Sequence, residues 1–105
     1  MSCITYTGDG NEEINASTIS NIGKAKDVIF IGYNTIKSET FQGNSYIETI
    51  NLPSTLTSIG YCAFKDCKNL KRITIPSSLQ HIDRHVFHNC TSLTSVIFET
   101  GSHLQ

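Results

Sequence analysis

The side chains best suited to metal chemistry gather in one short stretch, residues 81–90, with the sequence HIDRHVFHNC. It contains His81, His85, His88 and Cys90, and imidazole and thiolate groups are common Zn²⁺ ligands. Histidines four residues apart share one face of a helix, but His81 lies in a segment with an extended pattern, so the helical spacing does not apply to it. We therefore predict solvent-exposed histidines and no bound metal, with His85 and His88 as weak candidates.

No other arrangement of residues in the sequence indicates catalysis. Cys62 and Cys67 lack the second matching pair that a zinc site of this type needs. There is no G-x-S-x-G nucleophile motif, and the seven glycines are scattered and do not form a phosphate-binding loop. Two N-glycosylation patterns begin at Asn15 and Asn89, but chance matches to such a short pattern are common. We predict that the protein is not an enzyme and uses no cofactor.

A sequence repeat organises most of the chain. The segments 33–55, 56–78 and 79–101 align without a gap. Five apolar columns recur in them: Ile36, Ile59 and Ile82; Phe41, Phe64 and Phe87; Ile47, Leu70 and Leu93; Ile50, Ile73 and Val96; and Leu52, Ile75 and Phe98. The period of about 23 residues lies in the range of about 20–29 that indicates a leucine-rich-repeat solenoid, in which each coil completes its core against its neighbours.

Each repeat contains a strand, an extended segment and a turn. Residues 71–75 alternate polar and apolar types, which is typical of a half-buried strand, and Pro76 ends it. In the extended segment 56–59, Leu and Ile form the opposite wall, and Gly60 is expected to permit a sharp turn. Residues 63–67 suggest one helical turn. We predict an α/β repeat, a right-handed solenoid with a parallel sheet on one side and short helical turns on the other.

Two cysteines, Cys67 and Cys90, share one repeat position, which Asn44 occupies in the first repeat. Equivalent positions stack along a solenoid, so we expect an inward-facing ladder in which buried thiols act as small hydrophobes. A Cys67–Cys90 disulfide is the alternative, and it requires suitable geometry between neighbouring coils. Cys62 shares its position with His85, and we interpret this variable position as surface.

Residues 1–32 fit the period poorly, and we predict that they form an N-terminal cap. Within them, residues 27–31 (DVIFI) read as a strand that starts the sheet with a slip of one residue relative to later repeats. An earlier strand is expected at residues 4–6. The segment 8–13 (GDGNEE) reads as a turn, and residues 15–25 as a short helix.

The repeat region is predicted to span residues 33–105, with a partial fourth coil from residue 102. Leu104 would take the place of Leu79 after a two-residue insertion. No polar capping coil follows in this sequence, so we expect Val96 and Phe98 to leave apolar surface at the last coil.

Composition narrows the range of partners and locations. Eight Lys and Arg against nine Asp and Glu give a net charge of −1, which provides no basic excess for a phosphate backbone. No window approaches the roughly 18 apolar residues of a membrane span. The start, MSCITYTGDGNEE, has neither the basic head nor the apolar run of a secretory signal. We predict no nucleic-acid partner and no membrane insertion by this chain, and we leave its cellular location open.

The outward positions of the strands are the candidate partner-binding residues. They form two columns on the open face of the sheet: Thr49, Arg72 and Ser95; and Asn51, Thr74 and Ile97. Solenoids use such faces to bind partners, although Thr and Ser are also good strand formers that simply face water. Arg72 is central and can make forked contacts to a carboxylate, and Ile97 is apolar next to the last coil, which suits a contact surface.

The second repeat, LTSIGYCAFKDCKNLKRITIP, resembles the BspA-type leucine-rich repeat, whose unit is L-x-x-I-G-x-x-A-F-x-x-C-x-x-L-x-x-I-x-I-P. The resemblance extends over the repeats from Tyr33 onward, and the core aliphatic positions are kept throughout. The departures lie at Lys37, Glu39, Thr40 and Asn44 in the first repeat and at Asp83, Val86 and Glu99 in the third. Members of this family occur in host-associated bacteria and parasitic protists, often as surface proteins linked to adhesion.

Two hypotheses about function follow. The resemblance implies a non-enzymatic scaffold that binds a protein partner, adhering to host or matrix proteins at the cell surface. The alternative is a structural fragment of a longer solenoid, whose open C-terminal edge mediates self-association.

Overall fold

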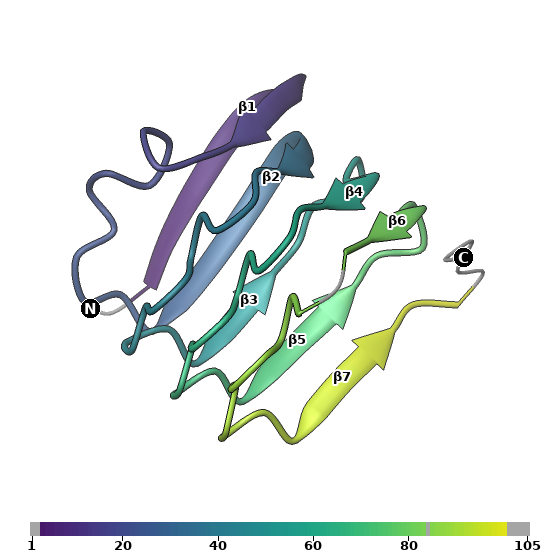
Figure 1. Ribbon diagram of the computed structural model, residues 1–105. Coiled ribbons are helices and arrows are strands. Elements are labelled where there is room, and N and C mark those ends of the chain that lie inside the picture. Colours follow the sequence, from purple (N-terminus) through teal and green to yellow (C-terminus); the bar gives the residue numbers. More distant parts are fainter. Residues whose placement is uncertain (1–2, 84, 101–105) are drawn as a thin grey trace.

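The computed structural model describes residues 3–83 and 85–100, which form a solenoid of stacked coils (Figure 1). Its strands are β1 (Cys3–Ile14), β2 (Asp27–Ile36), β3 (Thr49–Asn51), β4 (Ser58–Ile59), β5 (Arg72–Ile75), β6 (His81–Ile82) and β7 (Ser95–Phe98). All pairings between them are parallel, in the order β6-β4-β2-β3-β5-β7, and β1 also pairs with β2. The right-handed sense stays a prediction.

The long strand β2 joins two walls of the solenoid. Its first half pairs with β3, which is followed outward by β5 and β7, and these strands form the first wall. Its last residues pair with β4, which is followed by β6, and these form the second wall. The third side of each coil consists of turns (Figure 1).

The strand register confirms the period and the predicted slip. Ile36 pairs with Ile59, which lies one full repeat further on, whereas Val28 pairs with Ile50, which lies one residue short of a full repeat. Between these points lies Gly32, with a φ of 81°. A side chain there would collide with the backbone carbonyl of Gly8 in β1, so glycine permits both the left-handed conformation and the close approach of the two strands.

Two predictions for the N-terminal segment are wrong. The segment 8–13 is not a turn between elements but an irregular part of β1, where the pairing with β2 shifts between residues 7 and 12. Gly10 has a φ of 100°, which produces a local irregularity in this glycine-containing segment. The segment is nevertheless extended, because β1 pairs with β2, a strand that is remote in sequence. Residues 15–25 form successive turns instead of a helix. The side-chain oxygen of Asn15 accepts the N–H groups of residues 17 and 18, as expected for a residue type that favours turns.

The predicted helical turns at residues 63–67 are also wrong, and the described residues contain no α-helix, hence none that could cross a membrane. Alternate backbone N–H groups bond locally, as from Lys65 to the carbonyl of Cys62 (3.1 Å). The N–H groups between them reach the neighbouring coil, as from Phe64 to the carbonyl of Val86 (3.0 Å). Left-handed φ angles of 56° at Cys62 and 61° at Asp66 interrupt a helix on both sides.

Gly60 has a different role from the one predicted. It is not one of the residues with a positive φ, so backbone freedom does not explain it. A Cβ at this position would lie 2.6 Å from the backbone nitrogen of Ser38 in the preceding coil. The glycine therefore allows close approach of adjacent coils, which the Gly60 N–H group bonding to the carbonyl of Ile36 (2.9 Å) also reflects.

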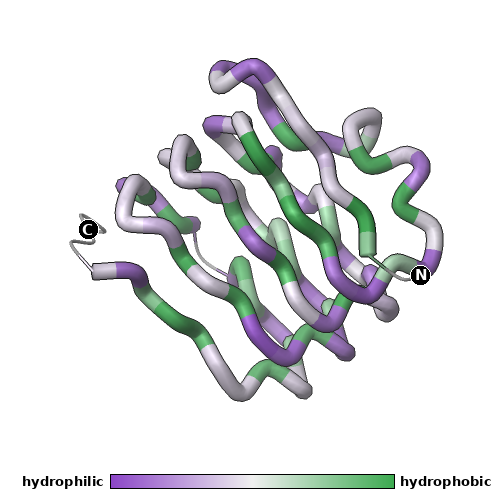
Figure 2. Tube along the Cα trace, turned by 180° about the vertical axis from the view of Figure 1, so that it is seen from behind, coloured by the Kyte–Doolittle hydropathy of each residue, from purple (hydrophilic) through white to green (hydrophobic). Residues whose placement is uncertain are grey.

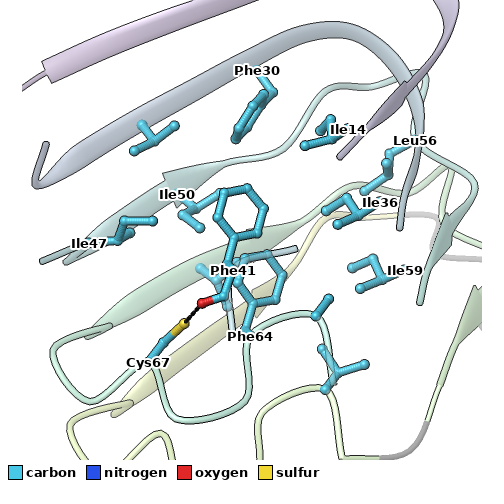
Figure 3. Packing of buried hydrophobic residues seen from close by; sticks show 14 of the residues in the cluster. Ile14, Phe30, Ile36, Phe41, Ile47, Ile50, Leu56, Ile59, Phe64 and Cys67 are labelled. Atoms are coloured by element: carbon cyan, nitrogen blue, oxygen red, sulfur yellow. Dashed lines mark hydrogen bonds between the residues drawn. The ribbon is translucent and has the colours of Figure 1, made fainter. Parts of the chain in front are cut away.

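A column of aromatic rings runs through the core (Figure 3). Phe41 and Phe64 stack with ring centroids 5.0 Å apart and an interplanar angle of 5°. Phe87 continues the stack 5.9 Å from Phe64, and Phe30 meets Phe41 edge-on at 5.8 Å. Phe41 and Phe64 are buried, whereas Phe87 is half-buried. The predicted phenylalanine column is therefore a stack from Phe41 to Phe87, and its first ring contacts Phe30 of β2 edge-on.

The cysteine ladder is present, with free thiols. Cys67 donates from its Sγ to the carbonyl of Phe41 (3.1 Å; Figure 3), and Cys90 donates to the carbonyl of Phe64 (3.0 Å). In the first repeat, the Oδ1 of Asn44 instead accepts the backbone N–H groups of the following residues. Burial raises the pKa of Cys67 to about 12, because the thiolate would lose its hydration.

We expect Phe64→Ala to lower the free energy of unfolding by about 3–5 kcal/mol, because it opens a cavity between two stacked rings. Phe87→Ala should cost less, because that ring is half-exposed already. Tyr61→Ala, an exposed aromatic in the same coil as Phe64, is the matched control and should have little effect. Urea denaturation followed by circular dichroism measures all three. Equal midpoints for the two phenylalanine variants would contradict the stacked column.

Cys67 should make stability fall at alkaline pH. Its thiol stays protonated in the folded chain up to about pH 12, whereas the unfolded thiol ionises around its ordinary pKa of 9.0. The contribution of the thiol is thus fully present below pH 9 and disappears between pH 9 and about pH 12. Urea denaturation at several pH values should show a shallower alkaline decline for Cys67→Ala than for the wild type. Parallel curves would exclude this role of the thiol.

Candidate functional site

The six predicted partner-binding residues lie together on the outer face of the first wall. Strand pairing aligns Thr49 with Arg72 and Arg72 with Ser95. It likewise aligns Asn51 with Thr74 and Thr74 with Ile97. The residues between them, such as Ile50 and Ile73, are buried, so the two columns point away from the core. Figure 2 shows the corresponding alternation of hydrophobic and hydrophilic residues along the coils.

This outer face extends beyond the predicted residues. Asp27 and Ile29 of β2 pair with Thr49 and Asn51, so they continue the same two columns toward the N-terminal strands. The repeat alignment alone did not identify them, because of the one-residue slip in this coil. The slip itself was visible in the apolar pattern of residues 27–31 and is the signal that could have found them.

A shallow hollow of about 270 Å³ lies on this outer face, between β3 and β5. It is lined by Thr49, Ile50, Asn51, Arg72 and Thr74. Asn51 and Arg72 are exposed, and the two threonines are half-buried. The lining therefore offers a guanidinium, an amide and hydroxyl groups, which can bind polar groups.

Most charged groups around this hollow already have partners. Lys71 Nζ lies 3.4 Å from Glu48 Oε1 in the neighbouring coil. The Thr49 hydroxyl donates to Asp27 Oδ1 at 2.6 Å. By contrast, Arg72 forms no ion pair and no side-chain hydrogen bond with any other residue that the structure describes. Its guanidinium is thus available to an external group.

A larger hollow of about 600 Å³ lies on the second wall, and the sequence did not single it out. Thr35, Ser58 and His81 form an aligned column in it, and Lys37 and Asp83 also line it. These residues flank the inward-facing isoleucine column of Ile36, Ile59 and Ile82 in the sequence. The alternation of polar and apolar residues could therefore have predicted that they form an outer face. Gly60 and Ser38 also line this hollow, where the two coils approach closely.

Of the three histidines that the structure describes, His81 lines the larger hollow, whereas His85 and His88 line neither hollow. The rings of His85 and His88 are 5.5 Å apart and edge-on, and both residues are exposed. Within residues 3–83 and 85–100 no group of three or more His, Cys, Asp or Glu side chains is positioned to hold a metal ion. The interpretation of the Cys62 position as surface is wrong, because Cys62 has a coil on each side and only 3% of it is exposed.

The outer edge of β7 carries a run of exposed apolar residues. Val96, Ile97 and Phe98 are 38%, 44% and 53% exposed, as predicted for Val96 and Phe98. Among the described strands β7 pairs with β5 alone, so its other edge has backbone groups without strand partners. The predicted fourth coil from residue 102 lies outside the described residues.

Comparison with known proteins gives consistent matches. Residues 11–104 match the family model of the BspA type leucine rich repeat region, in six copies. A leucine-rich-repeat protein of T. pallidum superposes with a TM-score of 0.70 and 27% identity, over 92% of this chain and 42% of that one. A leucine-rich cell surface protein of Faecalibacterium prausnitzii superposes with a TM-score of 0.65 and 20% identity, over 94% and 32%.

The chain thus spans less than half the length of either solved structure that it resembles. No curated protein sequence matches it significantly.

Proposed function

The chain belongs to the BspA-type leucine-rich-repeat family, and we propose that it binds a protein partner with the outer face of β3, β5 and β7. The observation that carries this proposal is the alignment of six outward-facing residues in two columns, four of which line one hollow. Extended solenoid faces of this kind present many side chains to a partner without disturbing the core. Because this role consists of binding alone, we infer that the protein is not an enzyme.

We further infer that the partner is a host or matrix protein and that binding serves adhesion at the cell surface. Two observations support this. The F. prausnitzii structure is described as a cell surface protein and shares the fold of this chain. The outer face also combines polar residues with an exposed apolar one, Ile97, as the contact surfaces of protein complexes do.

A panel of purified matrix proteins, including fibronectin, laminin and collagen, tests this function by biolayer interferometry. We expect saturable binding of at least one of them. Asn51→Trp should weaken it by about tenfold or more, because the indole fills the hollow and obstructs the face. Gln80→Trp is the matched control, since Gln80 is also an exposed amide but precedes β6 on the second wall. Circular dichroism confirms folding of both variants.

Loss of binding in both tryptophan variants, or in neither, would contradict the assignment of the partner to this face. Absence of binding to the entire panel would argue against adhesion to matrix proteins.

A second candidate function is self-association through the β7 edge, which the exposure of Val96, Ile97 and Phe98 favours. An edge strand with free backbone groups and apolar side chains is a template for another strand. In this role the chain is a structural segment, and its edge docks on another copy or on further coils.

Light scattering after size-exclusion chromatography, over a range of concentrations, tests this second function. We expect a concentration-dependent increase in molar mass for the wild type and a monomer for Phe98→Lys. Ile31→Lys is the control, because Ile31 is apolar and similarly exposed (51%, against 53% for Phe98) but lies in β2, away from that edge. A wild type that stays monomeric at all concentrations would exclude self-association.

A further inference from the structure

We propose that the hollow at Arg72 binds a carboxylate, and that the partner presents an extended segment with an acidic residue and an apolar residue two positions apart. This inference rests on the proposed function of the outer face and names the chemistry of the group that the face recognises. Four features of the site support it: the position of Arg72, the balance of charge around it, its neighbouring donors, and the placement of Ile97.

Arg72 occupies the middle of the first wall. It is paired with Thr49 on one side and Ser95 on the other, and both have short side chains. Its own side chain lines the hollow between β3 and β5. A group that enters this hollow therefore meets the guanidinium directly, with no bulky residue between them.

The charge at this point is positive, and no other described residue forms an ion pair with it. Arg72 is the one charged residue in β3, β5 and β7. Glu48 forms its ion pair with Lys71 (3.4 Å), and Asp27 accepts a hydrogen bond from the Thr49 hydroxyl (2.6 Å) and forms no ion pair with Arg72. An anion would gain a charged partner here without displacing an existing one, whereas a cation would be repelled.

The donors around the hollow fit a carboxylate in particular. The planar guanidinium presents parallel N–H groups that match two carboxylate oxygens, and such forked pairs are among the strongest hydrogen bonds of proteins. The Asn51 amide and the Thr74 hydroxyl line the same hollow, and neither makes a side-chain hydrogen bond with another described residue. Together they supply further donors to a group that only accepts.

Ile97 indicates which type of side chain the partner presents next to its carboxylate. It pairs with Thr74 and is thus the diagonal neighbour of Arg72 on the adjacent parallel strand. The strand spacing of about 4.8 Å and an offset of two residues, about 6.6 Å, place the two Cα atoms roughly 8 Å apart. In an extended peptide, side chains two residues apart point to the same side and are about 6.6 Å apart. An acidic side chain at Arg72 and an apolar side chain at Ile97, which is 44% exposed, can therefore come from one extended segment.

Titration of the isotope-labelled chain with two synthetic peptides, followed by amide NMR spectra, tests this inference. One peptide carries repeated Glu-Ser-Leu units, and the other carries Gln-Ser-Leu, with both ends blocked. We expect the glutamate peptide to shift amides of β3, β5 and β7 and to bind roughly ten- to a hundredfold more tightly than the glutamine peptide. Arg72→Ala should abolish this difference.

Lys71→Ala is the matched control, because it removes the same charge from the adjacent residue but from an ammonium that already faces Glu48. This variant should keep the preference for glutamate. Equal binding of the two peptides, equal losses in the two variants, or no shift at millimolar peptide would each overturn the inference.

The same variants separate the two proposals. If Asn51→Trp blocks the matrix protein and Arg72→Ala does not, the outer face binds a partner but does not read a carboxylate. If Asn51→Trp leaves matrix binding unchanged, the proposed function fails, whatever the peptides do.

Discussion

Each coil of this solenoid satisfies its backbone through the coil beside it, and the rest of the structure depends on this constraint. N–H groups on all three sides reach the carbonyls of a neighbouring coil, as from Lys71 to Glu48, from Gly60 to Ile36 and from Phe64 to Val86. Equivalent residues of successive repeats must then lie on top of one another. The stacked phenylalanines and the cysteine ladder follow from this alignment, because an apolar or small residue in one coil meets its counterpart in the next.

The sequence predicted well the features that depend on the stacking of equivalent residues, because stacking restricts the residue types allowed at each repeat position. The apolar columns revealed the period, and the misfit of Asp27, with Val28 and Phe30 fitting one residue later, revealed the slip in β2. The helical turns were predicted wrongly, because residues 63–67 contain good helix formers and a local reading ignores the next coil. There the N–H groups of Phe64 and Asp66 bond to the adjacent coil, which competes with a helix. Likewise, a glycine-rich segment inside β1 looked like a turn because its partner strand is remote in sequence.

For the candidate site too, the sequence predicted the features that strand alternation determines and missed those that depend on side-chain contacts. Alternation along the strands was sufficient to predict which residues of β3, β5 and β7 face outward. It could not show that Lys71 and Glu48 neutralise each other while Arg72 has no partner among the described residues, because this depends on side-chain conformations in two coils. The two hollows were similarly beyond prediction, since each is lined by side chains from separate coils.

The direction of the bonds between coils has a mechanical consequence. They run along the axis of the stack, so a load applied between the first and last strands pulls on them lengthwise. Under such tension, whichever coil ends a solenoid detaches first, since a terminal coil has a neighbour on one side only, and the next coil follows. Each step releases one repeat of slack chain, at roughly 3.3–3.6 Å per residue, while the remaining coils keep their ladder intact. The solenoid would thus yield as a series of small extensions, one coil at a time.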